Sequence, residues 1–208
     1  MLPVALVAAG CWRTIAVAAA TFLAGVVASS LAFGWSIWPV WVHMLAAKDP
    51  NQDVDRVRLD RMMPTVSANL QLLGAPVAAV HLVQLSFALV AVAVVWRLWR
   101  RGPTRIGIAA LAASARLPTP YGFVYDMVLT TGAVLLLIEE AMATKIALAA
   151  PELWVLVLTL VLPTTMFLSV ASTFPISTLV LVALVAVILR RAALSAPPRQ
   201  PRAQHQRA

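Results

Sequence analysis

The sequence has little charge, one cysteine and only scattered histidines, and each shortage excludes a class of protein. Only 12% of its 208 residues are charged and 62% are hydrophobic, whereas a soluble domain is about a quarter charged and half apolar. The single cysteine, Cys11, excludes an internal disulfide framework. His43, His81 and His205 lie far apart, and no HxxxH or CxxC spacing occurs, so no metal site is expected. The composition predicts an all-α multi-pass membrane protein.

The excess of basic residues gives a formal net charge of +8. Such a charge can indicate a nucleic-acid partner, but the arginines and lysines do not form one patch. Most of them lie at the ends of apolar runs, where basic residues set the orientation of membrane spans. The expected surroundings are therefore membrane lipids of the cell (plasma or inner) membrane, and no nucleic acid.

Apolar runs divide residues 1–191 into predicted membrane spans. A bilayer core about 30 Å thick needs roughly 20 helical residues. Residues 34–75 are predicted to form an outer loop that starts with a tryptophan cluster, and residues 192–208 a disordered basic cytoplasmic tail. The predicted spans are about 2–11 (partial), 14–33, 76–96, 106–118 (short), 121–138, 152–170 and 174–190.

The arginine-rich segments orient these spans. The connection Arg97–Arg105 and the tail from Arg190 are both expected in the cytoplasm. Counting spans back from the tail then places the segment Pro118–Asp126 and the 34–75 loop together on the extracytoplasmic face. This topology makes residues 106–118 cross the membrane alone, with roughly 20 Å of helix against a core of about 30 Å. A single kinked span over Ile106–Ile138 is the alternative, and it would expose one basic segment outside.

The segment Pro118–Asp126 interrupts the apolar pattern with two prolines and a glycine. Proline lacks the backbone donor that continues a helix, and non-helical backbone at membrane depth persists only where protein or water covers it. Two tyrosines and one carboxylate gather at this break. A functional site is one interpretation, and a kinked helix end with interfacial tyrosines is the other.

A second polar pair lies inside the predicted 76–96 span. His81 and Gln84 are three residues apart, so they share a helix face. We expect His81 to be a buried, hydrogen-bonded histidine, and a substrate contact is the alternative.

Three stretches of the chain resemble one family. Residues Pro118–Leu129 read PTPYGFVYDMVL, which resembles the TPY-x-x-x-YDLVLL stretch of glycosyltransferase family 87. Members are integral membrane mannosyltransferases that use polyprenyl-phosphate-mannose, together with bacterial relatives. Trp12–Trp38 is similar to the family's helix before its large outer loop, and Met63–Gly74 to the segment that follows. The resemblance covers roughly Leu2 to Leu189.

The resemblance implies a GT-C-like helical bundle and an inverting sugar transfer at the extracytoplasmic face. The donor would be a polyprenyl-phosphate-linked sugar and the acceptor a lipid or glycan hydroxyl, with no cofactor and no metal. Such chemistry needs a carboxylate base and cations for the leaving phosphate. The family carries its catalytic aspartate in the first outer loop. No position here matches it, so we expect a chain that lacks the N-terminal spans and holds no catalytic residue of its own.

The resemblance also implies a set of substrate contacts. Asp126 is expected to orient a sugar hydroxyl, or else to form a structural pair with Arg116 or Arg61. The tyrosines of the break are expected to stack on or hydrogen-bond a sugar, and the loop arginines to hold the donor phosphate, with a solvated surface as their alternative. The predicted substrate-binding residues are Asp126, Tyr121, Tyr125, Arg58, Arg61, Arg116 and His43.

Two other functions fit the composition. A transporter or channel fragment is one, although such proteins place ionisable residues deep in their spans, and here only His81 lies well inside. A non-catalytic multi-pass membrane protein is the other.

Overall fold

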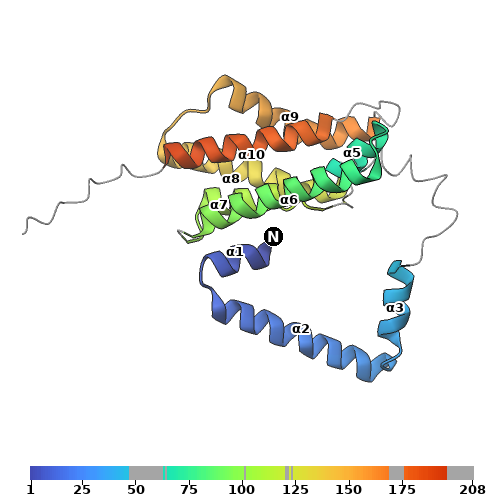
Figure 1. The fold of residues 1–208 in the computed structure, drawn as a ribbon. Helices are drawn as coiled ribbons and strands as arrows, with labels where there is room; N and C mark the ends of the chain where they lie inside the picture. The colour runs from blue at the N-terminus through green and yellow to red at the C-terminus, as the bar shows by residue number, and fades with distance from the viewer. Residues whose placement is uncertain are drawn as a thin grey trace, which may run out of the picture.

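The structure is a computed structural model that describes residues 1–46, 63, 65–100, 102–119, 122, 124–168 and 176–195. These residues form α-helices and one short 3-10 helix, and they contain no strand (Figure 1). The elements are α1 (Leu2–Ala8), α2 (Trp12–Phe33), α3 (Ile37–Ala46), α5 (Val66–Leu72), α6 (Val77–Trp99), α7 (Arg105–Ser114), η1 (Val124–Met127), α8 (Val128–Thr144), α9 (Ala150–Leu168) and α10 (Ile176–Leu194).

Local side-chain and backbone chemistry sets several of the helix ends. The Thr104 hydroxyl accepts a hydrogen bond from the Gly107 amide at 3.0 Å and so caps α7. Thr65 caps α5 in the same way by accepting from Ala68 at 3.2 Å. Each cap satisfies an amide that has no partner within its helix. At the C-terminal end of α2, Gly34 has φ +83°, a conformation that favours glycine and terminates the helix.

Helices α6, α7, α8, α9 and α10 form one bundle (Figure 1). Its centre is α7, whose alanines Ala109, Ala110 and Ala113 are fully buried. Small side chains let neighbouring helix backbones approach closely, which favours association of helices inside a membrane. Around α7 pack apolar side chains of the other four helices, among them Val94, Val134, Leu137, Leu156, Leu184 and Ile188.

Helices α2 and α3 lie apart from this bundle, whereas α1 contacts it. Helix α1 packs on α6, where Ala5, Val95 and Trp99 form a small buried cluster. Helix α2 contains no buried residue, and Figure 1 draws α2 and α3 away from the bundle. Most of the apolar surface of α2 is thus exposed in the described part of the chain.

Large apolar side chains also cover the outside of the bundle. On α6, for example, Leu82, Leu85 and Leu89 are exposed. By length and composition, Trp12–Phe33, Val77–Trp99 and Ile176–Leu194 can each cross a bilayer, and Arg105–Ser114 and Ala150–Thr164 are shorter apolar helices. The chain is therefore an all-α multi-pass membrane protein, as its composition predicts.

Several helix ends in the structure differ from the limits of the predicted spans, and the span assignments themselves stay predictions. Helix α8 begins at Val128 rather than near 121, because the proline break and η1 precede it, and it continues past Glu139. Helix α10 extends to Leu194, so the first residues of the predicted tail are helical. The predicted 34–75 loop contains the helices α3 and α5.

The prediction for His81 is wrong. His81 is exposed, whereas Gln84 is half-buried. The buried stripe of α6 includes Val80, Ala91 and Val94, and His81 lies one residue beyond Val80, about 100° around the helix. Sequence spacing alone does not indicate which side of an apolar helix packs on the protein.

Candidate functional site

The described residues between α7 and η1 are non-helical, and several of them are buried. Helix α7 ends at Ser114, and the next helical elements are η1 and α8. Between them, Arg116 is 5% exposed and Leu117 is 2% exposed, and Gly122 is also buried. Protein covers this irregular backbone, as non-helical backbone at membrane depth requires.

Arg116 and Asp126 form an ion pair across the break. The distance from Arg116 Nη1 to Asp126 Oδ2 is 3.6 Å. The Arg116 side chain is 5% exposed and that of Asp126 is 42% exposed. Arg116 is therefore the partner of Asp126 that the structure shows, and the carboxylate is the more accessible member of the pair.

Helix α5 meets this pair at Gly122. A Cβ atom added at Gly122 would lie 3.1 Å from Arg116 Nη2 and 3.4 Å from Thr65 Cγ2. Thr65 is the residue that caps α5, and it is 2% exposed. A side chain at position 122 would press on both neighbours, so the close approach of three segments favours glycine there. Gly122 of the break and Thr65 at the start of α5 thus lie close together in the fold.

A second set of contacts docks α5 on the bundle. The Asn69 side-chain amide donates hydrogen bonds to the hydroxyls of Ser177, at 2.9 Å, and Thr178, both in the first turn of α10. Asn69 and Ser177 are both buried. These bonds join residues more than a hundred positions apart in the sequence, and they fix α5 beside the Arg116–Asp126 pair.

The other predicted site residues are placed differently. Arg58, Arg61 and Tyr121 lie outside the described residues, and Tyr125 lies in η1, with its side chain outside them. His43 is exposed on α3, which the structure does not place against the Arg116–Asp126 pair (Figure 1). The structure therefore brings together Arg116 and Asp126 from the predicted set.

Sequence reasoning missed the polar residues that support this pair. Thr65, Asn69 and Ser177 are common residue types in loops and helix ends, so nothing in the sequence marks them as buried partners. The only local signal is Thr65 directly before a short apolar helix, a typical N-cap position.

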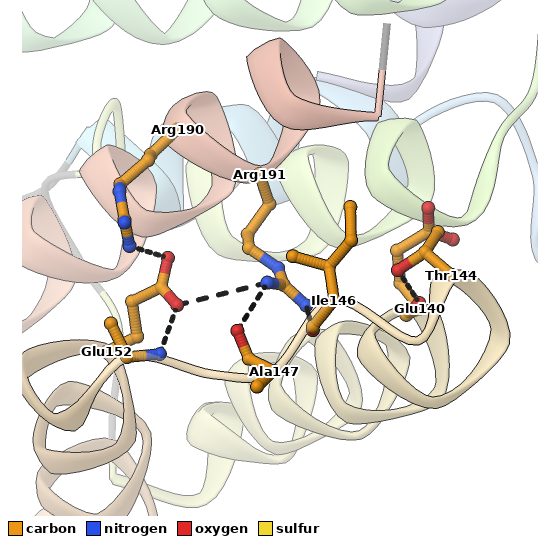
Figure 2. Close-up of polar contacts among 8 residues, drawn as sticks. Glu140, Thr144, Ile146, Ala147, Glu152, Arg190 and Arg191 are labelled. Carbon is orange, nitrogen blue, oxygen red and sulfur yellow. Dashed lines mark hydrogen bonds and ion pairs between the residues drawn. The ribbon is translucent and has the colours of Figure 1, made fainter.

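Sequence reasoning also missed a charged cluster at the other end of the bundle (Figure 2). Glu152 pairs with Arg190 and, at 3.9 Å, with Arg191. Arg191 donates hydrogen bonds to the Ile146 carbonyl, at 2.9 Å, and to the Ala147 carbonyl, at 3.3 Å. These contacts join the α8–α9 connection, the start of α9 and the end of α10. The cluster therefore has a structural role, since its bonds hold the end of α10 to the connection between α8 and α9.

The described residues contain no group of three or more histidine, cysteine, aspartate or glutamate residues that could hold a metal ion. The polar groups that gather at the break are instead a guanidinium, a carboxylate and neutral hydroxyl and amide groups. Such groups can bind hydroxyls by hydrogen bonding and can balance one negative charge.

The fold and the polar groups around Arg116 and Asp126 define a helical membrane protein with a polar site at one end of its bundle. The sequence profile of glycosyltransferase family 87 matches residues 1–120, more than half of the chain. The chain therefore belongs to glycosyltransferase family 87. No curated protein and no solved structure matches it.

Proposed function

We propose that the chain transfers a mannosyl or related hexosyl group from a polyprenyl-phosphate sugar to a hydroxyl of a lipid or glycan acceptor. Membership of the glycosyltransferase family supports the reaction class. The observation that supports the location of the site is the convergence of Thr65, Gly122, Arg116 and Asp126.

The proposal places this site on the extracytoplasmic face of the cell membrane. The convergence lies at the end of the bundle with α5, and the C-terminal ends of α6 and α10 lie at the opposite end (Figure 1). Those opposite ends carry Arg97, Arg100, Arg190 and Arg191, and arginine-rich ends favour the cytoplasm. The tail after α10 is cytoplasmic in the same proposal.

Asp126 has the central role in the proposed site. Its carboxylate accepts a hydrogen bond from a substrate hydroxyl, and the buried guanidinium of Arg116 holds that carboxylate in place. The proposal gives Asp126 this orienting role and leaves the base that removes the hydroxyl proton unassigned.

The remaining proposed contacts lie close in sequence to the site. Tyr121 and Tyr125 flank Gly122 in the chain and supply aromatic faces for a sugar. Arg58 and Arg61 precede Thr65 and supply guanidinium groups for the donor phosphate, which match phosphate oxygens in pairs. In the transfer, the acceptor oxygen bonds to the anomeric carbon as the bond from that carbon to the phosphate oxygen breaks. The cations stabilise the charge left on the phosphate.

Asp126→Asn tests the proposal in full-length protein reconstituted with a radiolabelled polyprenyl-phosphate sugar. Loss of a hydrogen bond from a hydroxyl to a charged carboxylate should lower kcat/KM roughly 10- to 100-fold. Glu139→Gln is the matched control, because Glu139 is an exposed carboxylate that pairs with Arg105 on α7. Unchanged transfer by Asp126→Asn would remove Asp126 from the site, and no transfer by the wild type would contradict the proposed donor.

A further inference from the structure

At the break, the Leu117 carbonyl needs a hydrogen-bond partner from outside its own helix. In a continued helix, the Leu117 carbonyl would accept from the amide four residues later. The chain instead leaves helical geometry after Ser114, and prolines follow at 118 and 120. Leu117 is 2% exposed and belongs to the apolar core of the bundle. A carbonyl without a hydrogen bond is costly in such surroundings.

Gln84 supplies that partner from α6. Its side-chain nitrogen Nε2 donates to the Leu117 carbonyl at 2.9 Å. Because a carbonyl can only accept, this bond fixes which end of the amide faces the break. The other end, Oε1, is buried and has no hydrogen-bond partner among the described residues. Gln84 therefore contacts the break in one defined orientation.

The Gln84 bond acts next to the ion pair of the proposed site. Leu117 directly follows Arg116, so a bond to the Leu117 carbonyl restrains the Leu117–Pro118 peptide unit, one residue beyond Arg116. Arg116 in turn pairs with Asp126 at 3.6 Å and packs against Gly122. A polar residue on a long apolar helix thus bonds to the backbone next to the residue that carries this guanidinium.

We propose that Gln84 is a positioning residue for sugar transfer: its amide holds the Leu117 carbonyl and thereby keeps Arg116 beside Asp126. The inference rests on the proposed function, because it assigns Gln84 an effect on the orientation of Asp126 toward a substrate hydroxyl. Gln84 itself touches no substrate in this account. A bond that served the fold alone would leave the transfer step unchanged.

Gln84→Met tests the inference in the full-length protein. Methionine has a similar length and removes the donor. Gln71→Met is the matched control, because Gln71 is an exposed glutamine on α5. Two readouts are compared: hydrogen exchange of peptides that cover residues 111–119, and the kinetics of sugar transfer.

The inference predicts faster exchange over residues 111–119 in Gln84→Met and no change in Gln71→Met. It predicts a kcat lower by roughly 10- to 100-fold, since small displacements of orienting groups have effects of this size, with the donor KM within about twofold. In an Asp126→Asn background, Gln84→Met should lower kcat less than about twofold further, because both changes act on the same group.

Unchanged exchange in Gln84→Met, or a full multiplicative loss in the double variant, would overturn the positioning role. A third result separates this inference from the proposed function. Faster exchange in Gln84→Met, together with no detectable transfer by the wild type, would support the contact between α6 and the break while overturning sugar transfer.

Discussion

Arg116 and Asp126 differ in exposure, and this difference decides what each residue can do. The Arg116 side chain is buried, with 5% exposed, whereas the Asp126 side chain is 42% exposed. A ligand that approaches this end of the bundle would meet the carboxylate first. In the proposed site, Arg116 therefore supports the carboxylate and Asp126 contacts the ligand, so Arg116 is a less direct phosphate ligand than its charge alone indicates.

Substitution of Gly122 should disturb this pair. In Gly122→Ala, the new methyl group would lie 3.1 Å from Arg116 Nη2, which is tighter than ordinary van der Waals contact. The guanidinium must move, so we expect a Tm lower by several degrees, corresponding to about 1 to 3 kcal/mol for overpacking. Thermal unfolding in detergent micelles measures the change.

Gly132→Ala is the matched control for this prediction. Gly132 lies inside α8, and a Cβ atom there meets nothing within 4 Å. Alanine favours the helix over glycine by up to about 1 kcal/mol, so Gly132→Ala should leave the Tm unchanged or raise it. Equal destabilisation by both variants would contradict the close approach at Gly122.

At this scale the sequence indicates some residues of the site and misses others. Asp126 and Arg116 are predictable because charges are rare in the apolar part of the chain. Asn69 and Gln84 are not, because their partners are a hydroxyl pair on α10 and a backbone carbonyl on another segment. Only the folded chain shows which neutral polar groups meet. The prediction for His81 fails for a related reason, since an all-apolar helix does not reveal its buried face.

Among the elements, the short helix α5 depends on its surroundings. It has seven residues, and isolated helices of this length are unstable in water. The Thr65 cap and the bonds from Asn69 to α10 hold it against the bundle. The helices themselves follow from apolar run length, and the break follows from its prolines. The docking of α5 does not, because it depends on contacts between distant residues.

The charged cluster of Glu152, Arg190 and Arg191 joins the end of α8, the start of α9 and the end of α10, at the end of the bundle away from α5. Arg191→Met would leave the buried carboxylate of Glu152 with less compensation and two carbonyls without their donor. Removal of one partner from a buried pair typically costs about 3 to 5 kcal/mol. We therefore expect a large decrease in Tm, measured by thermal unfolding in micelles.

Arg190→Met provides the comparison for the cluster. The Arg190 side chain is 54% exposed, and Glu152 keeps Arg191 and the Ala149 amide as partners without it. The loss should be smaller than for Arg191→Met, because the guanidinium that is removed is half exposed and only the Oε1 atom of Glu152 loses its partner. If Arg190→Met were as destabilising as Arg191→Met, Arg191 would not be the main partner in this cluster.

For the whole molecule, the sequence predicts the class of protein and the grouping of its basic ends. The apolar content predicts a helical membrane protein, and the arginine-rich segments lie at the end of the bundle opposite α5 (Figure 1). The separation of α2 from the bundle was not predictable, because α2 and the packed helix α6 are both long and apolar. Composition identifies membrane helices but does not distinguish a helix that packs on protein from one that does not.

Sidedness is the most direct test of the central claim, that the site around Asp126 faces the extracytoplasmic side. Leu73→Cys and Pro103→Cys place single thiols at exposed positions near opposite ends of α6, in a background with Cys11→Ser. A membrane-impermeant maleimide on intact cells should label Leu73→Cys, and it should label Pro103→Cys only after permeabilisation. The reverse pattern would place α5 and the site in the cytoplasm and contradict the account.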